Sequence, residues 1–212
     1  MPDVLTEIQE NLIQGAGPSI KELVNQAMEQ GNSADDILHN ALMPGMDEVG
    51  RRMKAGEYYI PDVLISARTM QMALELLKPH LVASGAAQAG TAIIGTVAGD
   101  LHDIGKNLVG MMLEGANLTV IDLGVDVSAE QFVAAAREHG ANLIGMSALL
   151  TTTMVSMQDT VDAFHEAGIR DQVKIVVGGA PVTQAYADEI GADGYAPDAG
   201  SAAVVARELL TD

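Results

Sequence analysis

A short polar turn near the middle of the chain carries the side chains best suited to chemistry. It holds Asp100 and His102 and ends at Gly105, directly after the apolar run 91–98. An aspartate two residues before a histidine can accept a hydrogen bond from one ring nitrogen and leave the other free to bind a metal. The glycine lets a flat or bulky ligand approach the backbone, and the helix expected from about Lys106 points its N-terminal amides the same way. This turn is therefore a candidate ligand site.

Other interpretations of the turn stay open. A lone histidine is more often a structural residue bonded to backbone groups than a ligand. A phosphate-binding loop is disfavoured, because five residues instead of four separate Gly99 from Gly105, and Asn107 stands where a magnesium-binding Ser or Thr is required. A hydrolytic metal pair of His102 and Asp103 usually needs further histidine ligands, whereas the remaining histidines are expected on helix surfaces: His39, His80, His139 and His165.

Composition narrows the classes of function. The chain has 212 residues, 48% of them hydrophobic, which is enough for one large or two small domains with buried cores. Eleven basic against 29 acidic residues give a formal net charge of −18, which disfavours binding to nucleic acids and to anionic membranes. The absence of cysteine excludes disulfides, thiolate metal sites and cysteine nucleophiles. No apolar stretch is long enough to span a bilayer and the N-terminus is acidic, so we expect a cytoplasmic protein.

The first part of the chain is predicted to be a small helical bundle. Apolar residues recur there at steps of three and four, as one face of a helix requires. Pro44-Gly45 predicts a kink or a new helix, and the small, uncharged residues 83–90 are typical of a hinge or linker. The other helices are expected to begin near residue 3, at Pro18, at the capping-box pair Ser33 and Asp36, and at Pro61.

The second part alternates between strand and helix patterns. Five βα units with crossovers of helical length predict a parallel sheet with helices on both sides. The expected fold is flavodoxin-like (Rossmann-like) with strand order 2-1-3-4-5. That order places the turns after Val97 and Ser147 at one crevice. We therefore expect a helical cap domain at 1–88 and an α/β domain at 89–212. The five β-prone runs are 91–97, 118–123, 142–147, 174–179 and 193–196.

Three motifs together resemble the cobalamin-binding domain of methionine synthase and of corrinoid proteins. They match that family in residue type and in spacing over residues 100–179, which is far more specific than a single glycine-rich loop. The helical part also resembles the family's cap module, in the stretch 43–68. The motifs are Asp100-x-His102-x-x-Gly105, then Ser147-x-Leu149, then Gly178-Gly179.

The resemblance implies a role for the polar turn. His102 would replace the cofactor's own base as the lower axial ligand of cobalt, in a cobalamin or related corrinoid whose metal cycles between Co(I), Co(II) and Co(III). Asp100 and Thr153 would form a hydrogen-bonded relay that takes up the proton change when the imidazole leaves or rejoins the metal. Without the resemblance, Thr153 and the nearby Thr151 are typical helix-entry residues.

Further positions follow from the same resemblance. Ser147 and Leu149 would line a pocket for the displaced nucleotide tail, and Gly178 and Gly179 would leave it room. Taken alone, the two glycines are an ordinary strand end. Met53 and Ile60 would lie above the metal, and packing in the bundle core is the alternative for both. The remaining cofactor-binding positions are Leu101, Asp103, Ile104, Gly105, Thr151 and Ala199.

The implied function is that of a methyl-carrying corrinoid subunit, which is not an enzyme alone. A substrate-specific methyltransferase would load it, an acceptor methyltransferase would deliver the methyl group to a pterin such as tetrahydrofolate or to a thiol, and a reductive activating protein would restore it. A mutase subunit is disfavoured because it usually lacks the helical cap. A cobalamin-dependent regulator is disfavoured because the charge opposes DNA binding. A binding module without a cofactor is the remaining alternative.

Overall fold

The computed structural model describes residues 3–83 and 89–211, and its chain divides into two compact units. One unit comprises residues 1–87 with 114–117, and the other comprises 88–113 with 118–212. The predicted linker falls largely on residues 84–88, which lie outside the described residues. The boundary after residue 88 therefore stays a prediction.

The first unit is helical, and its helices pack around fully buried aliphatic side chains that include Ile8, Leu12 and Ile20. The predicted capping box is present, because the Ser33 hydroxyl accepts the Asp36 N–H at 3.0 Å while the Asp36 carboxylate accepts the Ser33 N–H at 3.2 Å. The α-helices of this unit are α1 (Val4–Ile13), α2 (Gly17–Glu29), α3 (Ala34–Ile37), α4 (Met43–Lys54) and α5 (Ile60–Ala83).

A π-helical segment joins α3 to α4, where the sequence predicts a kink or a new helix. This segment, Leu38–Leu42, ends one residue before α4 begins. Pro44 lies in the first turn of α4, and because proline has no N–H, the usual ladder of helical hydrogen bonds is interrupted there. The chain accommodates the interruption by widening one turn rather than by breaking the helix.

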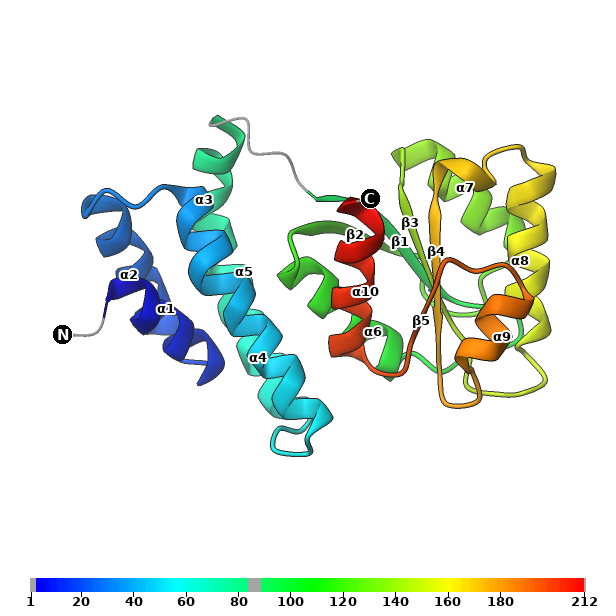
Figure 1. The fold of residues 1–212 in the computed structure, drawn as a ribbon, viewed down its shortest axis with the longest axis horizontal. Coiled ribbons are helices and arrows are strands. Elements are labelled where there is room, and N and C mark those ends of the chain that lie inside the picture. The colour runs from blue at the N-terminus through cyan, green and yellow to red at the C-terminus, as the bar shows by residue number, and fades with distance from the viewer. Residues whose placement is uncertain (1–2, 84–88, 212) are drawn as a thin grey trace. The chain divides into compact units, whose positions relative to one another are not determined.

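The second unit is a five-stranded sheet whose strands are all parallel, in the predicted order β2-β1-β3-β4-β5. Helices cover both faces of the sheet, with α6 and α10 on one face and α7, α8 and α9 on the other (Figure 1). The strands are β1 (Gly90–Thr96), β2 (Leu118–Asp122), β3 (Leu143–Ser147), β4 (Lys174–Gly178) and β5 (Gly194–Ala196). The helices are α6 (Ile104–Gly115), α7 (Ala129–His139), α8 (Val155–Glu166), α9 (Gln184–Glu189) and α10 (Ala199–Thr211), with a 3-10 turn at Arg170–Gln172.

The register of the sheet places the three sequence motifs side by side. At the carboxyl edge Thr96 pairs with Ser147, Ser147 pairs with Gly178, and Gly178 pairs with Ala196. The loops that follow these four strands therefore begin next to one another at this edge of the sheet. Ligands of open parallel sheets bind at this edge, next to the point where the strand order reverses between β1 and β3.

The glycine pair after β4 has a reason within the fold itself. A Cβ on Gly179 would lie 1.8 Å from the carbonyl oxygen of Ala148, and the residue has a φ of +132°. A Cβ on Gly178 would lie 2.9 Å from the carbonyl oxygen of Ala196. Both glycines therefore allow neighbouring backbone segments to approach closely, which the ordinary strand-end interpretation also expects.

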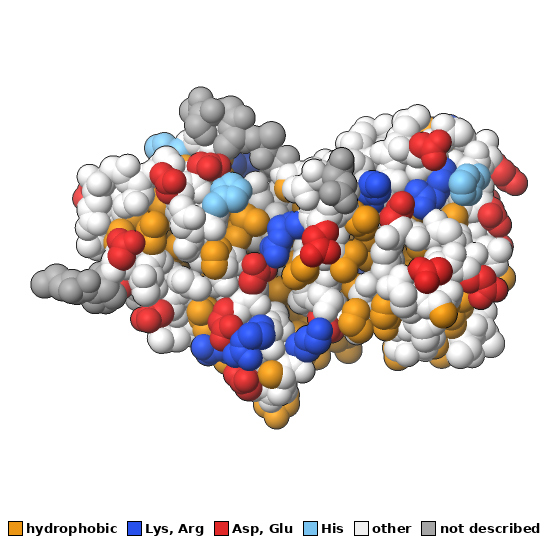
Figure 2. Space-filling model, in the orientation of Figure 1, with side chains coloured by type: hydrophobic (Ala, Val, Ile, Leu, Met, Phe, Trp, Pro, Cys, Tyr) orange, Lys and Arg blue, Asp and Glu red, His pale blue; other side chains and the backbone are white. Residues whose placement is uncertain are grey.

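Acidic side chains are spread over both units instead of forming one patch on the face drawn in Figure 2. Such a distribution fits a solvated acidic surface. The net negative charge would repel polyanions from the whole surface and not from one patch. None of the helices within the described residues is long and apolar enough to cross a membrane.

Candidate functional site

A tight turn carries the chain from β1 into the polar motif. The N–H of Asp100 donates to the carbonyl of Val97 at 3.1 Å, and Gly99, with a φ of +81°, occupies the third position of this turn. A type II turn requires a positive φ at that position, and glycine adopts it without steric cost. The turn carries the side chain of Asp100 into the protein, where it is 0% exposed.

The carboxylate of Asp100 is surrounded by hydrogen-bond donors. Its Oδ1 accepts from Nδ1 of His102 at 2.7 Å and from the His102 N–H at 3.1 Å. Its Oδ2 accepts from the Thr153 hydroxyl at 2.8 Å and from the N–H groups of Leu149 at 2.7 Å and Leu150 at 3.3 Å. These contacts place the first two motifs and Thr153 around one side chain.

The same contacts hold Asp100 in its charged form. Burial raises the pKa of this carboxyl group, but the hydrogen bonds from the Leu149 N–H, the His102 ring, the His102 N–H and the Thr153 hydroxyl together outweigh burial. They hold the pKa of Asp100 well below its ordinary value of 3.8. At neutral pH this side chain is a carboxylate and can only accept hydrogen bonds.

The charge on Asp100 decides which nitrogen of His102 is available. Because Asp100 can only accept, Nδ1 of His102 must be the N–H, and in the neutral ring Nε2 then carries the lone pair. The side chain of His102 is 53% exposed, so that lone pair is accessible from outside the domain. A carboxylate that orients a ring from behind is the usual support for a metal-binding histidine.

The turn that carries this imidazole also exposes large apolar side chains. Residues 101–105 are all exposed, and Leu101 and Ile104 expose 71% and 67% of their surface. Single exposed aliphatic residues are common, but several large ones in the loops of one sheet edge are typical of a ligand or interaction site. The other exposed aliphatic residues that follow the neighbouring strand are Leu149, Leu150 and Val155.

Gly105 is a glycine that the fold does not need. It lies in the first turn of α6, outside the left-handed region, and a Cβ built there would meet no atom within 4 Å. Glycine in a helix costs roughly 0.5–1 kcal/mol relative to alanine. Open space three residues after His102, at a position where glycine is locally unfavourable, is what a large flat ligand in close contact with the backbone would require.

The structure places the other predicted positions of this unit as follows. Ser147 is half-buried in the row at the carboxyl edge, and Ala199 is buried at the first position of α10. Thr151 is exposed in the turn that contains Thr153, and the carboxylate of the exposed Asp103 accepts a hydrogen bond from the Asn107 side chain at 3.3 Å. Their roles toward a cofactor stay predictions.

Thr96 and Lys106 make polar contacts at the site although neither belongs to the three motifs. Thr96 is 0% exposed, and its hydroxyl donates to the carbonyl of His102 at 2.8 Å. The side chain of Lys106 is buried, forms an ion pair with Asp122 and donates to Asn107. A lysine held this way does not face a phosphate, which is a second reason against a phosphate-binding loop.

The remaining histidines lie at exposed helical positions, as predicted: His39, His80, His139 and His165. Within residues 3–83 and 89–211, no three His, Asp or Glu side chains gather as a protein-built metal site requires. The chemistry of the donors therefore fits a metal that a cofactor already holds and that takes one imidazole from the protein.

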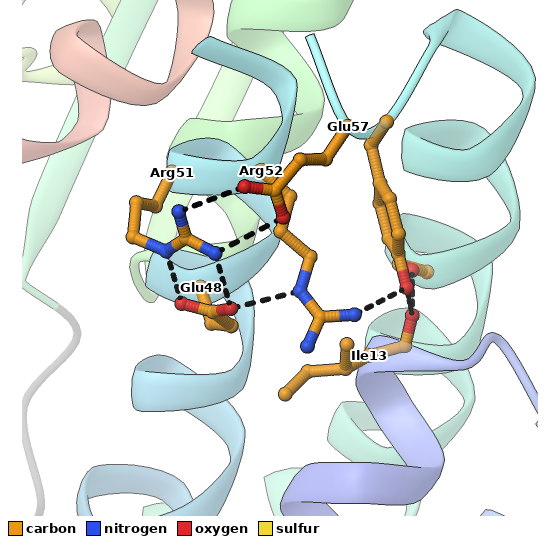
Figure 3. A network of polar contacts seen from close by, with 7 residues as sticks. Ile13, Glu48, Arg51, Arg52 and Glu57 are labelled. Carbon is orange, nitrogen blue, oxygen red and sulfur yellow. Dashed lines mark hydrogen bonds and ion pairs between the residues drawn. The ribbon is translucent and has the colours of Figure 1, made fainter. Parts of the chain in front are cut away.

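In the helical unit, a polar network fixes the junction between α4 and α5 (Figure 3). The Glu48 carboxylate accepts from Arg51 at 2.7 Å and from Arg52 at 2.8 Å, and these bonds lower its pKa to about 2. Arg52 donates to the Tyr58 hydroxyl at 3.1 Å, which in turn donates to the carbonyl of Ile13 at 2.9 Å. The network therefore ties this junction to α1.

Met53 and Ile60 flank this junction and lie outside the bundle core. Met53 is partly buried, and Ile60 is 42% exposed. The core interpretation is therefore wrong for Ile60 and holds only in part for Met53. Tyr59, Leu64 and Ile65 are also exposed, so the start of α5 presents an apolar surface. Its use above a metal stays a prediction.

Comparisons with known proteins match residues from both units to family models described as B12 binding domains. A family model described as a B12 binding domain matches residues 90–204, and a second B12 binding domain model matches residues 4–78. The chain belongs to the family of cobalamin-binding corrinoid proteins. Matches to two separate models in one chain also agree with a helical part followed by an α/β part.

Relatives of this family member align along nearly its whole length. A corrinoid protein of Desulfitobacterium hafniense (strain Y51) is 41% identical over 98% of this chain and 97% of the relative. Dimethylamine corrinoid protein 3 of Methanosarcina acetivorans is 42% identical over 90% of this chain and 91% of the relative.

Solved structures show the same similarity. A crystal structure of a cobalamin-binding protein from Desulfitobacterium hafniense DCB-2 matches with a TM-score of 0.83 and 30% identity, covering 96% of this chain and 97% of that chain. The methanol:cobalamin methyltransferase complex of Methanosarcina barkeri matches with a TM-score of 0.80 and 31% identity, covering 98% of this chain and 80% of that chain. The predicted family and fold are therefore confirmed.

Replacing Asp100 by asparagine tests the charged hub of the site. The asparagine NH₂ would face N–H or O–H donors, so we expect the free energy of unfolding at pH 7 to fall by about 2–4 kcal/mol. Because the pKa of Asp100 is depressed in the folded chain, its stabilising effect is complete above 3.8 and is lost as the pH falls toward the folded value. Urea denaturation at pH 7, 5 and 3 should show the difference from wild type shrinking at the lowest pH.

Asp103→Asn is the matched control, because this neighbouring carboxylate is exposed and accepts only from Asn107. It should change the free energy of unfolding by no more than about 0.5 kcal/mol at each pH. A pH-independent loss in Asp100→Asn would contradict the assignment of a charged, hydrogen-bonded carboxylate.

Proposed function

We propose that this chain binds cobalamin or a related corrinoid through Nε2 of His102 and carries a methyl group between two methyltransferases. One observation supports the cofactor assignment above all. Nδ1 of His102 lies 2.7 Å from the buried carboxylate of Asp100, which leaves the Nε2 lone pair available on an exposed side chain, with the exposed aliphatic residues Leu101 and Ile104 in the same turn. When bound, the corrinoid supplies the cobalt centre on which a methyl group is carried.

The residues of the α/β unit divide the task of holding the cofactor. His102 would supply a nitrogen ligand to the metal, and the exposed apolar residues Leu101 and Ile104 would contact the macrocycle. Gly105 would allow the ring to approach the backbone. Ser147 and Leu149 would contact the nucleotide tail at the carboxyl edge of the sheet, where Gly178 and Gly179 leave no side chain in the way, and Ala199 would contact it from the start of α10.

Asp100 and Thr153 would manage the proton on the imidazole. The ionised Asp100 accepts from Nδ1 of His102 and would stabilise a proton on Nε2 whenever that nitrogen binds no metal. The Thr153 hydroxyl donates to the same carboxylate at 2.8 Å and adjusts its basicity. Both residues would therefore tune how strongly His102 binds a metal.

The partners are inferred from the proteins that this chain is similar to. The relatives include dimethylamine and trimethylamine corrinoid proteins, and one structural neighbour is a methanol:cobalamin methyltransferase complex. We infer that a methyltransferase specific for a methylamine, methanol or a similar small donor loads this chain. An acceptor methyltransferase would then pass the group to a pterin or a thiol, and a reductive activating protein would keep the metal usable. The chain alone would not be an enzyme.

A mutase subunit or a cobalamin-dependent regulator is the second candidate function. Alignment over 98% of this chain and 97% of a corrinoid protein favours the carrier, because the match includes the helical part that a mutase subunit usually lacks. The net charge of −18 opposes the DNA binding that a regulator requires.

Replacing His102 by alanine tests the axial ligand. The full chain is reconstituted with hydroxocobalamin, and electron paramagnetic resonance of the Co(II) form reports whether an imidazole nitrogen is bound. Wild type should show the splitting from one protein nitrogen, and ¹⁵N-histidine labelling should change that splitting. In His102→Ala the splitting should no longer respond to ¹⁵N-histidine labelling, because any remaining nitrogen ligand would be the cofactor's own base, and cobalamin should bind at least tenfold more weakly. His139→Ala, on the exposed surface of α7, should behave as wild type. A splitting in His102→Ala that still changes with ¹⁵N-histidine would overturn the assignment.

Substitution of Gly105 tests where the macrocycle lies. Because a Cβ there meets no protein atom, Gly105→Ala should leave the free energy of unfolding unchanged or raise it by up to about 1 kcal/mol. Gly105→Leu should also fold, yet its side chain would occupy the space assigned to the ring. We expect affinity for cobalamin to fall in the order glycine, alanine, leucine in equilibrium binding. Equal affinities would place the ring elsewhere.

The carrier role is tested by separating the chain from its partners. Reconstituted and reduced chain should not consume dimethylamine, trimethylamine or methanol when each is supplied alone. Adding a methyltransferase specific for one donor, together with an acceptor methyltransferase, should give consumption of that donor and methylation of the acceptor, as measured by chromatography. Consumption of a donor by the chain alone would contradict the carrier role.

A further inference from the structure

Asp126, in the loop between β2 and α7, makes hydrogen bonds to the turn that precedes His102, although it is not part of any of the three sequence motifs. Its Oδ1 accepts the N–H of Gly99 at 2.7 Å, and its own N–H donates to the carbonyl of Asp100 at 3.0 Å. Asp126 thus binds the N–H at the start of the dipeptide Gly99-Asp100 and the carbonyl at its end. The peptide group between the two residues is held by a different contact, because the Asp100 N–H donates to the carbonyl of Val97. The backbone that carries the Asp100 side chain is thus fixed at three points.

The backbone conformation of Asp126 is unusual for a residue that is not glycine. Its φ is +55°, and among the described residues only Asn117 shares a positive φ without being glycine. Aspartate and asparagine tolerate this left-handed conformation better than other residues with a side chain, although it still costs free energy. Strain of this kind persists where the surrounding structure enforces it, and it concentrates near functional sites. Here it accompanies the two contacts to the turn.

The loop that carries Asp126 is itself firmly attached. The Val127 N–H donates to the carbonyl of Thr96 at 3.0 Å, and the Thr96 N–H donates to the carbonyl of Gly124 at 3.0 Å. The Gly124 N–H donates to Asp122 at 2.8 Å, and Asp122 forms an ion pair with the buried Lys106. The loop is therefore a rigid support and not a free segment that follows the turn.

We propose that Asp126 is a positioning residue that fixes the Gly99-Asp100 turn and thereby keeps the Nδ1 proton of His102 directed at Asp100. Asp126 contacts the backbone of Gly99 and Asp100 and would therefore act on the imidazole through Asp100. One oxygen of Asp100 accepts both the ring Nδ1 and the backbone N–H of His102, so a displaced Asp100 backbone weakens both bonds at once. The inference rests on the proposed function, because an oriented Nε2 matters when it binds a metal.

Three substitutions separate the contributions of Asp126. Asp126→Asn keeps the acceptor oxygen and the tolerance of a positive φ. Asp126→Gly keeps the backbone N–H and relieves the strain but removes the acceptor. Asp126→Ala removes the acceptor and also retains the strain. Asn117→Ala is the matched control, because it introduces the same backbone strain at the opposite end of α6, about 18 Å from the start of that helix.

The first measurement is the tautomer of His102 in the full chain without cofactor, by ¹⁵N NMR of histidine-labelled protein. Wild type, Asp126→Asn and Asn117→Ala should hold His102 as the Nδ1–H form. Asp126→Gly and Asp126→Ala should shift part of the population to the Nε2–H form. The second measurement is affinity for hydroxocobalamin, which should fall roughly tenfold in Asp126→Gly and Asp126→Ala and stay within about threefold in Asp126→Asn.

The two measurements distinguish this proposal from the proposed function. If wild type binds no cobalamin, the proposed function fails, whereas a shifted tautomer in Asp126→Ala still supports the positioning role. If wild type binds cobalamin and Asp126→Ala, folded by circular dichroism, keeps both the wild-type tautomer and affinity, the positioning role is overturned. An Asn117→Ala variant that matches Asp126→Ala in both measurements would also overturn it, because backbone strain alone would then explain the result.

Discussion

The site depends on one buried negative charge. Asp100 is fully enclosed, yet its two oxygens accept from the ring and N–H of His102, from two N–H groups after β3, and from the Thr153 hydroxyl. Burying a charge is costly unless hydrogen bonds replace the lost water, and here donors from two loops do so. The same bonds join the loop after β1 to the loop after β3. One side chain therefore connects the two loops and orients the imidazole.

Much of this arrangement can be predicted from the sequence. The parallel sheet follows from the alternation of apolar runs and helical segments, because parallel strands need crossovers and crossovers have one preferred hand. The family resemblance implies that Asp100, His102 and Thr153 form a relay, and the structure contains the hydrogen bonds from His102 and from Thr153 to Asp100. Patterns of this kind repeat along the chain and are visible without coordinates.

Contacts that depend on loop conformation leave no such pattern. The Thr96 hydroxyl donates to the carbonyl of His102, and Asp126 holds the Gly99 N–H. Both are contacts between a side chain and a backbone group, and the partner is set by the path of a turn rather than by residue type. Thr96 could be suspected, because a hydroxyl at the end of a buried strand needs a partner. Asp126 carries no comparable signal, since an aspartate in a loop is ordinary.

Several locally unfavourable choices meet at this one edge of the sheet. A carboxylate is buried, Gly105 interrupts the first turn of a helix, Asp126 adopts a left-handed backbone, and large aliphatic side chains such as Leu101 face outward. Each would be disfavoured in a domain selected for stability alone. The charge orients a nitrogen, the glycine leaves open space three residues further along the chain, and the aliphatic side chains expose apolar surface in the same loops. The choices therefore become consistent when a large, flat, metal-bearing ligand is taken as part of the native structure, because such a ligand would cover the apolar surface and occupy the space that the glycine leaves.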